Sequence, residues 1–184
     1  KKSWDLYDRL QLNLAPNPFR PQGAPDEALH NFGELRHYYG IPTTGPLPDG
    51  MALEMIHGYY ASVSYVDAQI GRLLDALSRL GLEKNTVVLL WGDHGWQLGE
   101  HGLWCKHSNF QTSLRAPLIV KAPGVAGGKS SAALTEFVDI YPTLCELCSL
   151  GAPSHLEGIS FVPLLHEPSR LWKQAVFSRF HDGD

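Results

Sequence analysis

Cysteine, basic residues and long apolar runs are all scarce in this sequence. Cysteine occurs three times in 184 residues, and an odd count in a chain of this length excludes a disulfide framework. Lysine and arginine number 15 against 19 acidic residues, so the basic footprint of a nucleic-acid-binding protein is missing. No apolar run approaches the ~20 residues of a membrane span. A chain with 43% hydrophobic and 18% charged residues is instead typical of a globular domain.

Two of the cysteines, Cys145 and Cys148, have the C-x-x-C spacing found in redox and zinc sites. A structural zinc site needs four ligands, and no second cysteine pair exists to complete one. The surrounding residues 137–150 are apolar and predict a helix, on which residues three apart share one face. We therefore interpret both cysteines as small core residues.

Both ends of the sequence look like cut ends of a longer chain. The first residues, Lys1 to Asp5, lack the pattern of a signal peptide and resemble the interior of a protein. The last residues, His181 to Asp184, do not resemble the end of a domain. We expect the chain to be a piece of a longer sequence.

The first fifty residues are rich in proline and predict loops around one short helix. Prolines and glycines punctuate residues 11–25 and 41–50, whereas residues 26–39 predict a short helix. From Ala52 to Leu80, apolar residues recur at spacings of three and four. This spacing predicts a long amphipathic helix whose apolar side packs on a core, with Gly81 as its C-terminal stop.

The remaining residues alternate between strand and helix patterns. The apolar, β-branched run at 86–91 is typical of a strand buried on both faces, as in parallel sheets covered by helices. Further strands are predicted at 117–122 and 175–180, and a helix is predicted at 131–149, bent or divided at Pro142.

These elements predict the α/β fold class, with a mainly parallel sheet flanked by helices. We see no internal domain boundary, so residues 1–184 are expected to form a single, partial domain. Within it, residues 1–50 would contribute the loops with the short helix and residues 51–184 the α/β core.

The stretch after the first predicted strand carries the residues suited to chemistry. In open α/β sheets, ligands bind beyond the carboxyl ends of strands, and Asp93 and His94 follow the strand that ends at Trp91. A carboxylate and an imidazole here can face one cation; the alternative is a capping aspartate beside a hydrogen-bonded histidine. Lys106 can bind an anion as a point charge, or lie solvated on the surface.

Other residues of this stretch have less specific signals. We expect His101 to form structural hydrogen bonds, and we leave the role of His107 open. Trp96 and Trp104 suit either the apolar wall of a pocket or packing beneath the loop. We interpret Cys105 as buried and inert, because no neighbouring base or helix N-terminus activates its thiol.

Together these residues resemble the type I sulfatases of the alkaline phosphatase-like superfamily, in particular their iduronate-2-sulfatase branch. The resemblance covers most of residues 50–150, in the order that the family has. It lies in four segments: Gly58–Leu74; Trp91-Gly-Asp-His-Gly-Trp-Gln-Leu-Gly-Glu-His-Gly-Leu-Trp-Cys-Lys-His-Ser-Asn-Phe110; Arg115-Ala-Pro-Leu-Ile119; and Phe137-Val-Asp-Ile-Tyr-Pro-Thr-Leu144.

The resemblance implies roles for four residues. Asp93 would be a ligand of a divalent cation, and His94 would lie beside that metal and the sulfate as a catalytic residue. Lys106 would bind a sulfate oxygen and stabilise charge during catalysis. Trp96 would border the sugar pocket. We add His107 to Trp96 and Lys106 as a candidate substrate-binding residue. The family implies Ca²⁺, although a histidine neighbour by itself suggests zinc or manganese.

The family's nucleophile is a formylglycine made from the motif C/S-x-P/A-x-R, and this motif is absent from the 184 residues. We therefore expect a central fragment of a sulfuric ester hydrolase, inactive alone, whose partners are a sulfated carbohydrate and the remainder of the sulfatase chain. The alternatives are a phosphodiesterase or phosphonate hydrolase of the same superfamily, and a non-catalytic fragment or binding module. Relatives are periplasmic, secreted or lysosomal, but these residues leave the localisation unknown.

Overall fold

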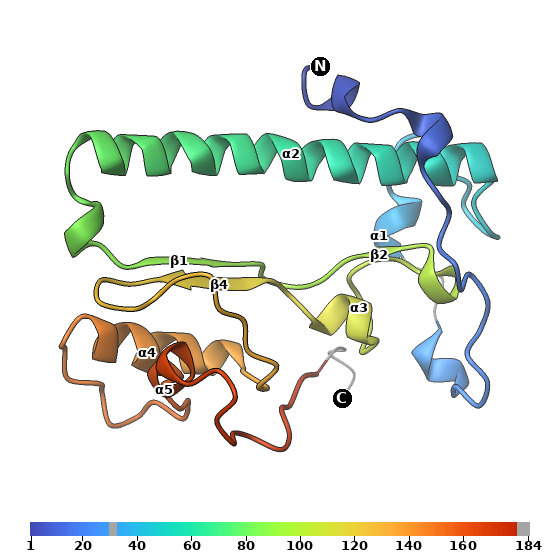
Figure 1. Ribbon diagram of the computed structural model, residues 1–184. Helices are drawn as coiled ribbons and strands as arrows, with labels where there is room; N and C mark the ends of the chain where they lie inside the picture. The colour runs from blue at the N-terminus through green and yellow to red at the C-terminus, as the bar shows by residue number, and fades with distance from the viewer. Residues whose placement is uncertain (30–32, 180–184) are drawn as a thin grey trace. The chain divides into compact units, whose positions relative to one another are not determined.

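The computed structural model describes residues 1–29 and 33–179 (Figure 1). Their contacts divide the chain into two compact units. Residues 1–76 and 92–117 form most of the first unit, and residues 77–91 and 118–178 form the second. None of the described helices has the length and apolar character needed to cross a membrane.

Short helices precede one long helix in the first unit. Three 3₁₀ helices, η1 (Trp4–Leu6), η2 (Arg9–Gln11) and η3 (Asp26–Ala28), are followed by the single α-helical turn α1 (Gly33–Arg36). The helix predicted at 26–39 is thus present only as η3 and α1, and its residues 30–32 lie outside the described part of the chain.

The long helix α2 (Asp49–Arg79) confirms the prediction from apolar spacing. It is followed by Gly81, whose φ of 68° is the left-handed conformation that commonly ends a helix. Only the N-terminal half of the apolar stripe is buried, at Ala52, Ile56 and Ala61. Further along, Leu73 is 71% exposed, so the prediction that the whole stripe packs on a core is wrong within this chain.

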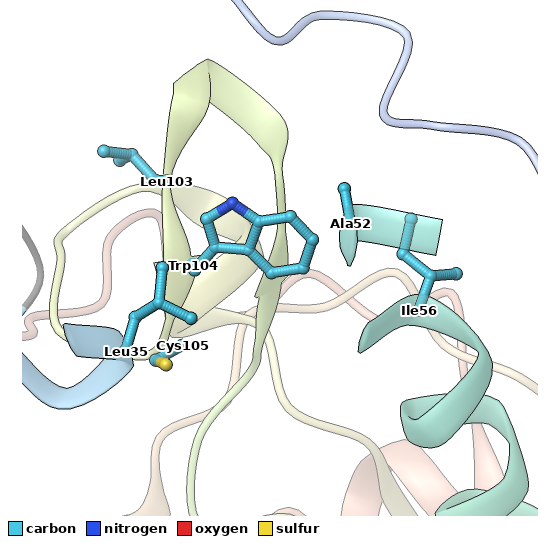
Figure 2. Close-up of a cluster of buried hydrophobic side chains, with 6 residues drawn as sticks. All are labelled: Leu35, Ala52, Ile56, Leu103, Trp104 and Cys105. Atoms are coloured by element: carbon cyan, nitrogen blue, oxygen red, sulfur yellow. The ribbon is translucent and has the colours of Figure 1, made fainter. Parts of the chain in front are cut away.

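A small hairpin completes the first unit. Strands β2 (Gln97–Leu98) and β3 (Trp104–Cys105) pair antiparallel around the 3₁₀ turn η5 (Glu100–Gly102), and α3 (Gln111–Leu114) follows. Figure 2 shows the core between hairpin and helices, with the Trp104 indole directed toward α2 and Leu35 beside Cys105. The buried members of this core are Leu35, Ala52, Ile56, Leu103, Trp104 and Cys105.

The second unit packs two helices on a two-stranded ladder. After η4 (Glu83–Asn85), strand β1 (Val88–Trp91) pairs with β4 (Leu118–Lys121). The 3₁₀ turn η6 (Phe137–Asp139) leads into α4 (Ile140–Leu147), and α5 (Val162–His166) completes the unit. Apolar side chains of α4 and α5 pack against those of β1 and β4, which places the helices over the ladder (Figure 1).

Among the described residues, both strand pairings are antiparallel, in contrast to the mainly parallel sheet predicted from sequence. The chain leaves β1 at Trp91 and re-enters at Leu118, and these two residues are opposite each other in the register. Because the connection begins and ends at the same end of the ladder, the strands must run in opposite directions. The expected burial of β1 on both faces is also wrong, since Leu90 and Trp91 are exposed.

Two further predictions for the second unit need correction. The helix predicted at 131–149 is reduced to η6 and α4, and Pro142 lies in the first turn of α4. A proline there loses no intrahelical hydrogen bond, so the residue helps to begin the helix instead of bending it. The strand predicted at 175–180 is absent from residues 175–179, and residue 180 lies outside the described range.

The three cysteines are all unpaired thiols. Cys145 is buried in the core, as expected from its place in an apolar helix. Cys148 is exposed at the end of α4, so its predicted burial is wrong.

Candidate active site

Two glycines hold the loop after β1 against α3 and the residues that follow it. The amide of Gly92 donates to the carbonyl of Pro117 at 3.0 Å, and that of Gly95 donates to Ser113 at 2.7 Å. A Cβ on Gly95 would lie 2.0 Å from the carbonyl oxygen of Thr112, so no larger residue fits this approach. The glycines therefore fix the backbone from which Asp93 and His94 project.

Asp93 and His94 are adjacent in space as well as in sequence. The side chain of Asp93 is 85% exposed, and its Oδ2 lies 3.4 Å from Nε2 of His94. Nδ1 of His94 is 2.8 Å from the carbonyl oxygen of Gly95. Because a carbonyl oxygen only accepts, Nδ1 donates the proton of this hydrogen bond, and Nε2 is the ring nitrogen that faces the carboxylate. This arrangement suits either a proton or a cation between Nε2 and the carboxylate.

Trp96 connects His94 to Lys106. The ring centroids of His94 and Trp96 are 6.0 Å apart, and the Lys106 ammonium lies 5.3 Å from the Trp96 ring centroid. Tyr59 of α2 stacks near the same indole at 6.1 Å. The structure thus arranges the predicted residues in a row, in which Asp93 contacts His94, His94 neighbours Trp96, and Trp96 neighbours Lys106.

Lys106 is paired with an acid that the sequence interpretation missed. Its ammonium donates to both carboxylate oxygens of Glu34 at 2.6 Å, and Nε2 of His107 lies 3.6 Å from Glu34 Oε2. Glu34 is 72 residues away in sequence, on α1. Nothing in the local pattern of the short helix distinguishes this glutamate from a solvated one.

The electrostatics of this pair favour its ionised form. Burial raises the pKa of Glu34, but the hydrogen bond and charge of Lys106 outweigh burial and bring the pKa below its ordinary value. Tyr38 donates to Glu34 Oε1 at 3.2 Å. Burial, reinforced by Cys105 and Glu34, raises the pKa of Tyr38. Burial, with the charge of Glu34, also raises the pKa of the Cys105 thiol to about 11, so this wholly buried thiol stays protonated at neutral pH.

The remaining residues of the loop have structural contacts. Trp104 is buried in the core, which favours packing over a pocket wall. The ring of His101 packs on Phe110 at 4.6 Å, and its amide donates to Asn17 at 2.7 Å. Glu100 accepts a hydrogen bond from the amide of Leu98 at 2.7 Å and so orients the hairpin backbone.

The described residues contain no group of three or more histidine, cysteine or acidic side chains placed to hold a metal ion. Calcium takes about six to eight oxygen ligands. Asp93 and His94 have the donor atoms and exposure of a partial metal site, and the other ligands would have to come from elsewhere.

Solved structures define the class of fold. The phosphonate monoester hydrolase from Silicibacter pomeroyi matches 92% of this chain and 35% of its own, at 29% identity and a TM-score of 0.74. The structure of BT4656 with its substrate D-glucosamine-2-N,6-O-disulfate matches 71% of this chain and 27% of its own, at 31% identity and a TM-score of 0.66. The predicted α/β fold class is confirmed: the chain has the alkaline phosphatase-like fold over the part of it that these structures cover.

The sequence comparisons identify the family within this class. The family model described as Sulfatase matches residues 14–150, and iduronate 2-sulfatase from Homo sapiens is 34% identical over 209 residues. The chain therefore belongs to the sulfatase family. The alignment with the human enzyme covers 96% of this chain and 38% of the enzyme, so the chain spans well under half of that relative's length.

Proposed function

We propose that the chain forms one wall of the active site of a sulfuric ester hydrolase that removes sulfate from sulfated sugars. The rest of the site would come from the remainder of a longer sulfatase chain. The proposal rests on the row of Asp93, His94, Trp96 and Lys106, in a chain that belongs to the sulfatase family. The human relative's name, iduronate 2-sulfatase, supports a sulfated uronate as the substrate.

Lys106 and His94 are the proposed catalytic residues. Negative charge develops on the leaving oxygen when a sulfate ester is cleaved, and an ammonium held beside the ester stabilises that charge. The bond from Nδ1 to Gly95 leaves Nε2 of His94 as the atom that faces the cation or the ester. Trp96 presents an aromatic face to the sugar, and His107, beside Glu34 and Lys106, contributes a polar contact to the substrate.

Asp93 and His94 are the proposed metal ligands, and calcium is the proposed ion. Enzymes of the sulfatase family use a divalent cation and a formylglycine, which supplies the nucleophile when present. A cation held by Asp93 would polarise the ester and add to the stabilisation from Lys106. Since the C/S-x-P/A-x-R motif is absent from this sequence, we expect the isolated chain not to turn over sulfate esters.

Alanine substitutions in the full-length enzyme test the assignment. Lys106→Ala and Asp93→Ala should each lower kcat/KM for a sulfated uronate disaccharide by about a hundredfold or more. The first removes a contact to the transition state, and the second removes a ligand of the proposed cation. Lys84→Ala, in η4 of the second unit, is the matched control and should retain activity. Near-normal turnover by the two site variants would refute the proposal.

A phosphonate monoester hydrolase is the second candidate, because the enzyme from Silicibacter pomeroyi matches nearly the whole chain. Sulfate and phosphonate monoesters of one alcohol, compared with the same full-length protein, separate the candidates. A higher kcat/KM for the phosphonate ester would favour the second.

A further inference from the structure

The ammonium of Lys106 faces a carboxylate within its own chain. Both Glu34 oxygens accept hydrogen bonds from it at 2.6 Å, and the two side chains are only 27% and 21% exposed. The positive charge that Lys106 brings to the proposed site is therefore largely cancelled by Glu34.

The surrounding structure holds this pair in place. Leu35 follows Glu34 and Cys105 precedes Lys106, and both are wholly buried in one core, side by side in Figure 2. Tyr38 donates to one carboxylate oxygen, and the His107 ring approaches the other. Exposed ion pairs between long, mobile side chains are commonly weak. Here the buried neighbours Leu35 and Cys105 fix the backbone at Glu34 and Lys106, and Tyr38 and His107 hold the Glu34 carboxylate.

We propose that Glu34 is a specificity-determining residue that selects esters with a single negative charge and disfavours dianionic phosphate monoesters. This inference rests on the proposed function, since it assigns Lys106 to the substrate's anionic group. Sulfate monoesters and phosphonate monoesters both carry one negative charge, which makes them the substrate class that this wall accepts.

The selection follows from the way in which charge interactions scale. The attraction between an ammonium and an anion is proportional to the anion's charge, so an unpaired lysine attracts a dianion about twice as strongly as a monoanion. The repulsion between Glu34 and an anion is likewise proportional to the anion's charge, so it is about twice as strong for a dianion. The dianion therefore loses the stronger attraction that an unpaired lysine would give it. An ammonium has three N–H donors, and the two bonds to Glu34 leave one for an oxygen of the ester.

The test compares two esters of one alcohol in the full-length protein. We expect Glu34→Gln to raise the kcat/KM ratio of 4-nitrophenyl phosphate to 4-nitrophenyl sulfate at least tenfold at pH 8. Glu27→Gln, an exposed glutamate of η3, should keep the wild-type ratio. A ratio that stays constant while both rates fall would overturn the inference, because it would reduce Glu34 to a structural support.

A conservative variant separates charge from shape. Glu34→Asp retains the negative charge with a shorter side chain, and we expect it to keep a ratio close to that of the wild type. A shift in Glu34→Asp as large as that in Glu34→Gln would contradict the charge argument. If the glutamine variant folds poorly, Glu34→Asp alone still tests the charge argument, because a tenfold rise of its ratio above that of the wild type would contradict it.

A second measurement is independent of turnover. Peptide mass spectrometry measures the acetylation of Lys106 at increasing concentrations of one of two anions at pH 8. One is methyl sulfate, a monoanion, and the other is methyl phosphate, a dianion. In the wild type, methyl phosphate should protect Lys106 from acetylation no better than methyl sulfate does. In Glu34→Gln, methyl phosphate should give the same protection at a concentration at least fivefold lower than that of methyl sulfate. Equal protection in the variant would overturn the inference. If the full-length protein does not cleave the sulfated uronate disaccharide, the proposed function fails, and this protection measurement alone decides the role of Glu34.

Discussion

The ammonium of Lys173 in the second unit neutralises a buried carboxylate. It donates to the two oxygens of Asp139 at 2.8 and 2.7 Å and to Glu136 at 2.7 Å. The Asp139 side chain is wholly buried, and that of Lys173 is 15% exposed. Asp139 also accepts the amides of Glu136 and Ile159 at 2.9 and 2.8 Å, so one carboxylate joins three separate segments.

Lys173→Met should therefore destabilise the protein strongly. The change removes the ammonium but leaves the carboxylate of Asp139 buried, and breaking such a pair typically costs about 3 to 5 kcal/mol. Because the two backbone amides still bind Asp139, we expect a loss near the lower limit, about 3 kcal/mol. For a chain of this size, that loss corresponds to a fall in Tm of about 6 to 12 °C.

Urea unfolding followed by circular dichroism measures this loss, with Lys129→Met as the matched control. Lys129 forms one exposed bond to the carbonyl of His166 at 3.3 Å, and its removal should change the unfolding free energy by less than about 0.5 kcal/mol. Adding Asp139→Asn to Lys173→Met should recover at least about 1 kcal/mol, because the unpaired charge is then gone. A loss for Lys173→Met no larger than that of the control would refute the reasoning.

Three further predictions follow from the described contacts. Gly95→Ala should lower the unfolding free energy by about 2 kcal/mol in the same urea assay, since its Cβ would overlap a carbonyl of α3. Gly50→Ala is the control: no atom lies within 4 Å of the added Cβ, so this change should be neutral or stabilising. The pKa of Glu34 is lowered, so its pairing with Lys106 should stabilise the protein fully above pH 4.5, and this stabilisation should be lost as the pH falls through the lower folded-state pKa. Urea unfolding at a series of pH values should therefore show the stabilities of the wild type and Glu34→Gln converging in acid. A stability difference that stays constant with pH would contradict this. Iodoacetamide at pH 8 should modify the exposed Cys148 in the folded protein but Cys105 only after unfolding. Peptide mass spectrometry measures both rates of modification, and equal rates in the folded protein would disprove the burial of Cys105.

Features with a local signal were predictable from the sequence alone. The spacing of apolar residues determined α2, and Gly81 marked its end, because a helix face and a left-handed turn are properties of neighbouring residues. The stretch that begins at Asp93 was interpreted as a candidate site, since polar residues and glycines follow directly after a strand, and this interpretation stays a prediction. The same stretch carried the resemblance to sulfatases, which the family match confirms.

Only the tertiary structure decided which residues face each other. The antiparallel pairing of β1 with β4 depends on where the intervening loop returns, and apolar composition is the same for either direction. The partner of Lys106 depends on Leu35 and Cys105 meeting in one core, which brings Glu34 within 2.6 Å across 72 residues of sequence. A charge pair of this kind has no sequence period, because the packing of other side chains creates it.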